Sequence, residues 1–596
     1  MTLHLHPADL VVLGLYLCIP LAIGVALRNR GSKDTGSFFL SGRSLPWWLA
    51  GTSMAADTFA SDTPLYIAGI VRGGGIAANW EWWSFAFSGM LSVFVLARLW
   101  RRSEAVTDIA FVEFRYEGRS AAALRGIKAF LLAVPFNCIV LGGLPLLAMA
   151  KLLLVMGGVD PGDEAARGIA KLAAILVCLG VVLAYSTVSG LWAVVWNDFV
   201  LFWLALAGAV VLCGYAVSEV GGLAALREGI LAADPPGMAR LDFVPSPGTA
   251  AFSAFLVFMG VQWWAHRTVD GGGVNIQRML ACRNEGHAVA ASLWFNVINY
   301  AVRTWPWILT GLAAVLLYPE IADREAAYPM AIRDLLPAGV RGFVVASIFA
   351  AFMTTADSQL NWGASYLVND LYRRFVRSDA GEEHYLRVSR WSVLGLAAVT
   401  AVVAFAGTSV EQTFKFLISF SAGTGTVFLA RWLWWRVNAW GELAAVLTAA
   451  AASVAWFLLT ATSADRPVPL LDVPGHWRVP SVAAATILAW VTVTLATPPV
   501  SMARLVEFYR RTRPPGFWGP VRAASPDLPP SAPIARDLGH AAAGLALVLG
   551  AMLGTGKILL GEPGAGIAFL LAAAGGGIVL WRAYRDPAPP GAGPGV

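Results

Sequence analysis

Long runs of apolar residues constrain this chain more than any other feature of its sequence. About fifteen stretches of roughly 20 mostly apolar residues follow one another between residues 9 and 581. A run of that length with few charges crosses the hydrocarbon core of a bilayer as one α-helix. Helices satisfy their own backbone hydrogen bonds where lipid offers no partner. The sequence therefore predicts an all-α polytopic membrane protein with about fifteen transmembrane helices.

The scarcity of charge excludes most other classes of protein. Of the 596 residues, 57% are hydrophobic and 13% are charged, whereas a soluble domain carries about 25% charged residues. A soluble enzyme, a nucleic-acid binder and a disordered scaffold are therefore excluded. We find no H-x-x-x-H, G-x-S-x-G or metal-spaced Cys/His set, so we expect no enzyme activity. No obligatory protein partner is evident either.

The basic residues predict how the chain is oriented. The net charge of +6 comes from short clusters between apolar runs. Such clusters mark cytoplasmic loops. Examples are Arg28 and Arg30, Arg101 and Arg102, Arg373 and Arg374, and Arg510 and Arg511. We therefore expect a multi-pass protein of the cell (inner) membrane with its N-terminus outside and its C-terminus cytoplasmic. The first apolar run is expected to be a retained helix, because no basic segment precedes it.

Two of the predicted spans are interrupted by polar residues or glycines. Numbering the spans from zero, span one is Leu45–Val71 and carries Asp57, Thr58, Ser61 and Asp62 in its middle. Span six, Ala250–Trp264, runs into three glycines at Gly271–Gly273, which cannot hold a stiff helix. Each opens a block of five spans, and an odd block length inverts the second block. Paired interrupted helices in two halves point to a transporter site.

The chain divides into five parts on this basis. Residues 1–40 hold an extra N-terminal helix, and 41–436 form an inverted-repeat transport core. Residues 437–500 form two peripheral helices, 501–537 a cytoplasmic loop rich in Pro and Arg, and 538–596 a C-terminal helix pair and tail.

Four short motifs give the chain a family resemblance. They are GRSLPWWLAG (42–51), WND (196–198), IQRMLACRNEGHA (276–288) and AAFMTTADSQL (350–360). Together they resemble the sodium/solute symporters that include the proline and sugar symporters, over roughly residues 9–460. The resemblance implies a LeuT-like fold, an inverted five-helix repeat with broken helices one and six. It also implies Na+ as the coupling ion.

The resemblance implies a sodium site between spans one and eight (Phe343–Leu371). Its ligands would be the carbonyls of Ala56, Phe59 and Ala351 and the hydroxyls of Thr354 and Thr355. Oxygen ligands suit a small hard cation, and the i, i+3, i+4 spacing places the last three residues on one helix face. Alternatively, the two hydroxyls only bond back to carbonyls of their own helix.

A second sodium site, found in some members, would lie between span five (Leu191–Val217) and span eight. Its positions here are Asp198, Thr354, Asp357 and Ser358, although the family more often has a hydroxyl at the third of these. Carboxylates inside a membrane are functional candidates by default. Asp198 and Asp357 would hold a second sodium or share a proton. The alternative is that Asp357 pairs with a buried base such as Arg303.

Many proline-type members have an essential aspartate in span one. Alignment places Thr58 at that position, with Asp57 and Asp62 on either side. Asp62 lies one helical turn from Thr58, so it is a candidate solute contact. Equally, either aspartate could cap a half-helix.

Aromatic residues suggest where the solute binds. In NWEWW (79–83), Glu81 follows Trp80, and the sugar members have a similar Glu that bonds the solute. Trp263 and Trp264 precede the break in span six, and Asn299 lies in a polar stripe of span seven. Tryptophan faces pack on sugar rings or on cations. Alternatively, these tryptophans belong to the interfacial belt and the polar stripe joins helices.

The segment after Trp264 departs from the sugar members. AHRTVDGGG (265–273) places His266, Arg267 and Asp270 where those members hold uncharged groups. The solute class therefore stays open. We expect a sodium-coupled symporter that imports a small polar organic solute, sugar/polyol or amino-acid-like, by alternating access. The alternatives are a proton-coupled carrier and a transporter-like solute sensor.

Overall fold

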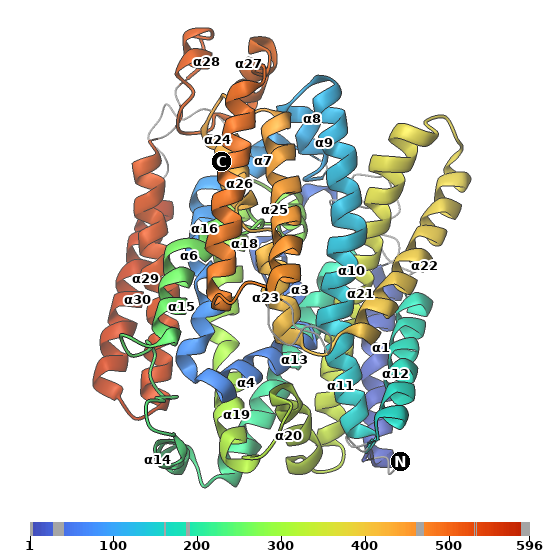
Figure 1. The fold of residues 1–596 in the computed structure, drawn as a ribbon, viewed down its shortest axis with the longest axis vertical. Helices are drawn as coiled ribbons and strands as arrows, with labels where there is room; N and C mark the ends of the chain where they lie inside the picture. The colour runs from blue at the N-terminus through green and yellow to red at the C-terminus, as the bar shows by residue number, and fades with distance from the viewer. Residues whose placement is uncertain are drawn as a thin grey trace.

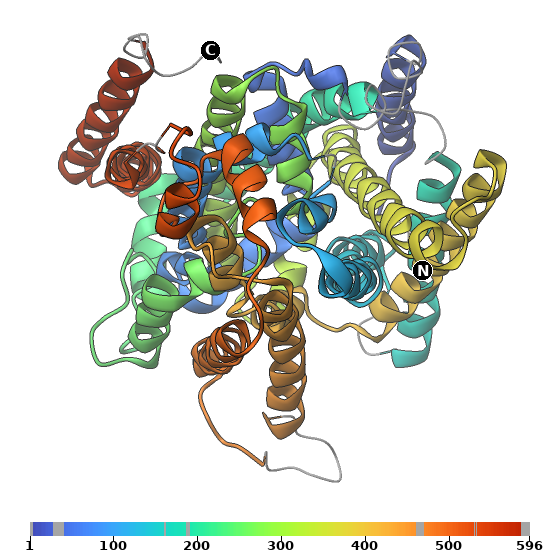
Figure 2. The ribbon, with the colours of Figure 1, turned by 90° about the horizontal axis from the view of Figure 1, so that it is seen from above.

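The chain is almost entirely helical. The computed structural model describes residues 4–27, 41–105, 107–159, 163–185, 191–460, 470–529, 531 and 533–585. Within these ranges there is no β-strand, only two isolated bridges, Leu45 with Cys282 and Trp434 with Phe517. Most helices run roughly along one direction (Figure 1). Seen along that direction, the outer helices surround a central group of helices (Figure 2). Arg28 and Arg30, used above for orientation, lie outside the described residues.

The helices around the centre of the molecule lie between residues 7 and 433. They are α1 (Pro7–Leu27), α3 (Trp47–Asp57), α4 (Asp62–Gly74), α5 (Trp80–Trp83), α6 (Phe85–Leu91), α7 (Ala97–Ser103), α9 (Gly118–Leu131), α10 (Asn137–Leu141), α11 (Leu147–Met156), α12 (Glu164–Tyr185), α13 (Leu191–Glu219), α15 (Ala250–Val257), α16 (Trp263–Ala265), α17 (Gly273–Ala281), α18 (Glu285–Asn296), α19 (Thr304–Leu317), α21 (Val340–Ser365), α22 (Glu382–Ala406), α23 (Val410–Phe420) and α24 (Thr424–Leu433).

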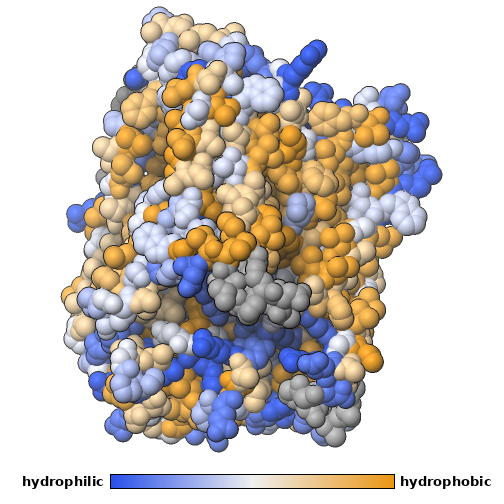
Figure 3. Space-filling view, viewed as in Figure 1, coloured by the Kyte–Doolittle hydropathy of each residue, from blue (hydrophilic) through white to orange (hydrophobic). Residues whose placement is uncertain are grey.

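Further helices lie at the ends and the edge of the molecule. They are α8 (Ala110–Arg115), α14 (Leu223–Ala233), α20 (Ala327–Leu335), α25 (Ala439–Thr460), α26 (Arg478–Ala496), α27 (Met502–Thr512), α28 (Gly519–Ala523), α29 (Ile534–Leu559) and α30 (Pro563–Arg585). In Figure 1, α14 and α20 lie at the lower end with the N-terminus, and α27 and α28 lie at the upper end. Hydrophobic surface covers much of the height between these ends, and hydrophilic residues gather at the lower end (Figure 3).

Fewer helices than expected are long and apolar enough to count as membrane spans. Within the described residues, eleven helical segments are long and apolar enough to cross a membrane, or twelve when the bent pair α23 and α24 counts as one. The fifteen predicted spans are therefore not confirmed. The three spans that fall short are zero, one and six. Spans one and six are divided by breaks, and in span zero the apolar helix is counted only from Pro7 to Pro20.

Prolines distort span three, which lies against the site. Pro135 and Pro145 each fall in a π-helical turn, Leu132–Phe136 and Gly142–Leu146. A proline cannot donate the helical hydrogen bond, so an extra residue is accommodated locally. The carbonyl of Pro145 itself accepts a hydrogen bond of 2.7 Å from the hydroxyl of Ser61, in the break of span one.

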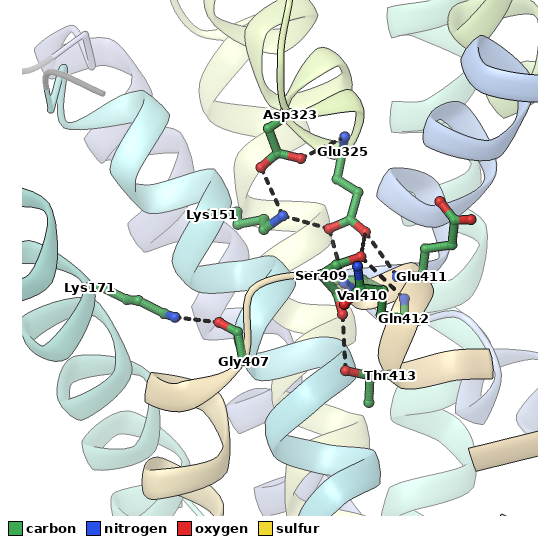
Figure 4. A network of polar contacts seen from close by, with 10 residues as sticks. All are labelled: Lys151, Lys171, Asp323, Glu325, Gly407, Ser409, Val410, Glu411, Gln412 and Thr413. Carbon is green, nitrogen blue, oxygen red and sulfur yellow. Dashed lines mark hydrogen bonds and ion pairs between the residues drawn. The ribbon is translucent and has the colours of Figure 1, made fainter. Parts of the chain in front are cut away.

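An ionic network joins the loop that carries Asp323 and Glu325 to the start of span ten (Figure 4). Glu325, in the short turn Arg324–Ala326, is buried and points at the N-terminus of α23. Its carboxylate accepts hydrogen bonds from the backbone N–H groups of Val410 at 3.0 Å and Glu411 at 2.9 Å. Lys151, from α11, lies 2.6 Å from the same carboxylate. One side chain thus satisfies a helix N-terminus and joins it to span three.

We expect Glu325→Ala to lower the free energy of unfolding by about 3 kcal/mol, because it leaves two helix N–H groups without their acceptor and takes from Lys151 the more buried of its two carboxylate partners. The change is measured by denaturant titration in detergent. Glu320→Ala is the matched control, since Glu320 is exposed in the same loop. Equal losses from the two changes would contradict this role of Glu325.

Candidate functional site

Span one breaks in its middle, as predicted. α3 ends at Asp57 and α4 begins at Asp62. The break leaves carbonyls at the end of α3 with non-helical partners. The carbonyl of Ala55 accepts the hydroxyl of Thr58 at 3.0 Å and a guanidinium N–H of Arg303 at 2.9 Å. The carbonyl of Ala56 accepts the backbone N–H of Phe59 at 2.9 Å.

Span six breaks at the predicted glycines. α16 ends at Ala265 and α17 begins at Gly273. Gly271 and Gly272 have φ angles of +118° and +71°, which favour glycine because a Cβ would be strained there. A Cβ at Gly273 would also lie 2.8 Å from the ring of Trp362. The three glycines therefore serve both the turn and the close approach of α21.

A cavity of about 450 Å³ lies between the two breaks. Thr58 and Asp62 from span one line it, as do Thr268 and Gly272 from span six. Aromatic side chains form much of the remaining wall, including Tyr66, Trp82, Phe85, Phe136, Phe295, Tyr300 and Phe414. The rings of Trp82 and Tyr300 stack with centroids 5.6 Å apart and planes 21° apart. The cavity offers flat apolar faces beside polar groups, which is the composition of a small-molecule site.

The residues of the predicted sodium site come from helices that touch. α3 contacts α21, so the break of span one lies against the helix that carries Ala351, Thr354 and Thr355. The hydroxyl of Thr355 is buried without a hydrogen-bond partner, and the residue lines the cavity. The hydroxyl of Thr354 donates to the carbonyl of Ala351 at 3.1 Å. A buried hydroxyl without a partner is costly, and a cation ligand would relieve that cost.

Asp198 lies in a buried charge cluster that the sequence alone did not predict. Its carboxylate accepts the hydroxyl of Ser53 at 2.6 Å. Arg278, from α17, lies 3.5 Å from Asp198 and 2.9 Å from Asp57. The three charged side chains are less than one tenth exposed. Two carboxylates thus share one guanidinium, and the cluster has one negative charge in excess.

Two other residues predicted for the second sodium site come from α21. Asp357 is half-buried, and its carboxylate accepts the side-chain amide of Asn361 at 2.7 Å. Ser358 is also half-buried. The expected alternative partner, Arg303, bonds instead to the carbonyl of Ala55 and to Asn299.

The predicted solute contacts divide into two groups. Asp62 and Asn299 line the cavity, whereas Trp80, Glu81, Trp263 and Trp264 lie outside its lining. The indole N–H groups of Trp263 and Trp264 donate to carbonyls of their own helix, four residues earlier, at 2.9 and 2.7 Å. Both indole N–H groups are thus used within their own helical segment.

Glu81 and Trp80 are engaged elsewhere. The carboxylate of Glu81 lies 3.7 Å from the ammonium of Lys415 on α23. The indole of Trp80 donates to the carbonyl of Phe243 at 2.7 Å. The neighbouring Trp82 is the member of NWEWW that reaches the cavity. Helical periodicity places Trp80 and Trp82 on different faces of this short helix. It could have shown which of them faces the cavity only if the orientation of the helix were known.

Sequence comparisons place the chain among known transporters. The family model for the sodium:solute symporter family matches residues 38–449. The chain is 25% identical over 512 residues to sodium/glucose cotransporter 2 of Rattus norvegicus, covering 78% of this chain and 74% of the relative. It is also 25% identical over 582 residues to sodium/myo-inositol cotransporter 2 of Oryctolagus cuniculus, covering 88% and 82%.

The fold comparison agrees. The structure is similar to a Na+-coupled sialic acid symporter in a substrate-bound outward-open state, with a TM-score of 0.62 and 19% identity. The match covers 83% of this chain and 99% of the other. At this identity the similarity concerns the fold alone.

Proposed function

Because the chain belongs to the sodium:solute symporter family, we propose that it imports a small polar solute of the sugar or polyol class together with Na+. Because it belongs to this family, the chain is a multi-pass membrane transporter and not an enzyme. The sugar or polyol class is supported by relatives described as sodium/glucose and sodium/myo-inositol cotransporters.

The observation that carries this proposal is the cavity between two broken helices. Breaking a helix at the middle of a membrane leaves carbonyls that can replace the water around a cation. Stacked aromatic faces beside Asp62 and Asn299 supply both the flat surface and the hydrogen-bonding groups that a hydroxyl-rich ring needs. Solute and ion would thus meet at one place.

The sodium site proposed here uses the carbonyls of Ala56, Phe59 and Ala351 with the hydroxyls of Thr354 and Thr355. The orphan hydroxyl of Thr355 supports it most directly. Sodium would bind first and raise the affinity for solute, and solute would raise the affinity for sodium by the same factor.

The proposed cycle alternates access around this fixed site. The core of residues 41–436 would form an inverted five-helix repeat whose halves rock against each other. We place the N-terminus outside and the C-terminus in the cytoplasm of the inner membrane. Acidic residues of the loop that carries Asp323 and Glu325 at one end, and arginines of α27 at the other, support this orientation.

One observation favours a second candidate, coupling to protons. Asp57 and Asp198 share Arg278 in a buried cluster, and two close carboxylates can hold one proton between them. In that case a pH gradient without sodium would drive uptake.

Thermal unfolding of the purified protein tests the sodium proposal. A ligand that binds only the folded state raises stability by mass action. At a sodium concentration about 100 times its dissociation constant, we expect about 2.7 kcal/mol of stabilisation, with none from potassium or choline chloride at equal ionic strength. The same rise in all three salts would contradict a sodium site.

A further inference from the structure

One cation that lines the cavity forms no ion pair within the part of the chain that the structure describes. Arg267 lies in the break of span six, lines the cavity and packs on Phe136, with its guanidinium carbon 4.0 Å from the centre of that ring. Its Nε is buried and has no hydrogen-bond partner. Among the residues that the structure describes, no carboxylate comes within 4 Å of it. A cation held in this way is costly unless an anion joins it.

The neighbouring acids are already engaged. Asp270 lies 2.6 Å from Arg431 on α24. Glu442, from α25, lies 2.9 Å from Lys128 and 3.2 Å from Arg431. Each of these carboxylates is buried with its own cation, so neither is available to Arg267.

Asp108 is the remaining acid on this side. It and Arg267 line a smaller adjoining cavity of about 50 Å³. Its carboxylate accepts a hydrogen bond from the hydroxyl of Tyr366 and lies beyond ion-pair distance from Arg267. Arg267 therefore forms part of the wall between the two cavities and also faces the larger one.

The other charged side chains that line the larger cavity each interact with an opposite charge within the protein. Asp57 pairs with Arg278 at 2.9 Å. Arg303 bonds to the carbonyl of Ala55 at 2.9 Å, and its charge interacts with that of Asp62. The lining thus carries two carboxylates, Asp57 and Asp62, and two guanidiniums, Arg267 and Arg303; of these two guanidiniums, only that of Arg267 has both a buried nitrogen without a hydrogen-bond partner and no hydrogen bond to the rest of the described protein.

On this basis, and on the proposed function above, we propose that the solute is an acidic sugar or sugar acid whose carboxylate binds Arg267. A planar guanidinium can bind a carboxylate through two parallel hydrogen bonds, and such charge-assisted pairs are strong. Beside Arg267, the ring of His266 is held by Ser88 at 3.3 Å and Thr268 at 2.7 Å. The remaining hydroxyls of the solute would meet the aromatic wall and Asn299. This assigns a role to the charged segment that distinguishes span six from the sugar members.

Three pairs of compounds that differ by one carboxylate test this inference: D-glucuronate with D-glucose, D-galacturonate with D-galactose, and D-gluconate with D-sorbitol. Each is titrated into the full-length protein in sodium chloride, and the rise in unfolding temperature gives its half-saturating concentration. In at least one pair, the acid is expected to half-saturate at a concentration about tenfold or more below its neutral partner, since a charged hydrogen bond is strong.

Two variants test whether Arg267 causes the preference for the acid. Arg267→Gln is expected to remove the preference for the acid, and Arg267→Lys to keep part of it because the charge remains. Asp108→Asn is the control and keeps the preference. Sodium still stabilises all three variants, which shows that they are folded.

Four results bear on the outcome. Equal responses to acid and neutral compound in all three pairs overturn the inference, and so does a preference that survives in Arg267→Gln. Loss of the preference in Asp108→Asn as well would overturn it, because Arg267 would then serve a purely structural pair. A wild type that sodium does not stabilise contradicts the proposed function instead, so the two failures are distinguishable.

Discussion

Replacing Thr354 and Thr355 together by alanine is expected to abolish the stabilisation by sodium, a loss of about 2.7 kcal/mol at a sodium concentration 100 times the dissociation constant. The change removes two of the five proposed ligand oxygens from one helix face. Thr355→Ala alone is expected to have the larger effect of the two single changes. Its hydroxyl is orphaned and buried, whereas that of Thr354 already bonds to Ala351. The measurement is thermal unfolding in sodium against choline.

Ser347→Ala is the matched control for this prediction. Ser347 lies on the same helix, α21, and its buried hydroxyl donates to the carbonyl of Val344 at 2.8 Å. We expect this variant to keep the full sodium effect. A sodium effect that persists in the double variant would show that the ion binds elsewhere.

The second large effect is expected from Arg278→Gln, which removes the single cation between Asp57 and Asp198. Both carboxylates then lie buried without a partner charge, and breaking such a pair costs about 3–5 kcal/mol. Denaturant titration in detergent measures this loss. Adding Asp57→Asn in the same chain is expected to recover much of it, because one of the two charges is then gone.

Arg283→Gln provides the comparison, because Arg283 is exposed just beyond the end of α17. It is expected to change the free energy of unfolding by about 0.5 kcal/mol or less. If Arg278→Gln changed the free energy of unfolding as little as Arg283→Gln, the charge cluster would not stabilise the packing of spans one, five and six against one another.

The breaks in spans one and six could be predicted from the sequence because their causes are local. Polar residues around Asp57 and three successive glycines interrupt apolar helices whatever surrounds them. The number of spans was harder to predict than the two breaks. Where a helix is broken, as in α3 and α4, length and hydropathy alone do not register a span.

The direction of individual side chains could not be predicted. Trp80 and Trp82 differ by two positions in one short helix, and only the packed structure shows that the second of them faces the cavity. The cluster of Asp57, Asp198 and Arg278 joins three helices that are distant in the sequence. No spacing within a single span could have revealed that an acid of span one and an acid of span five share one arginine.

Gradient-driven uptake tests the central claim most directly. Proteoliposomes that contain the purified protein would be given an inward sodium gradient, with labelled D-glucose, myo-inositol and D-glucuronate outside. We expect at least one of these solutes to accumulate above its external concentration, and the accumulation to collapse when sodium is equal on both sides. A membrane potential of 100 mV alone supplies about 2.3 kcal/mol per sodium. Uptake that is indifferent to sodium and driven by a pH gradient would contradict the account.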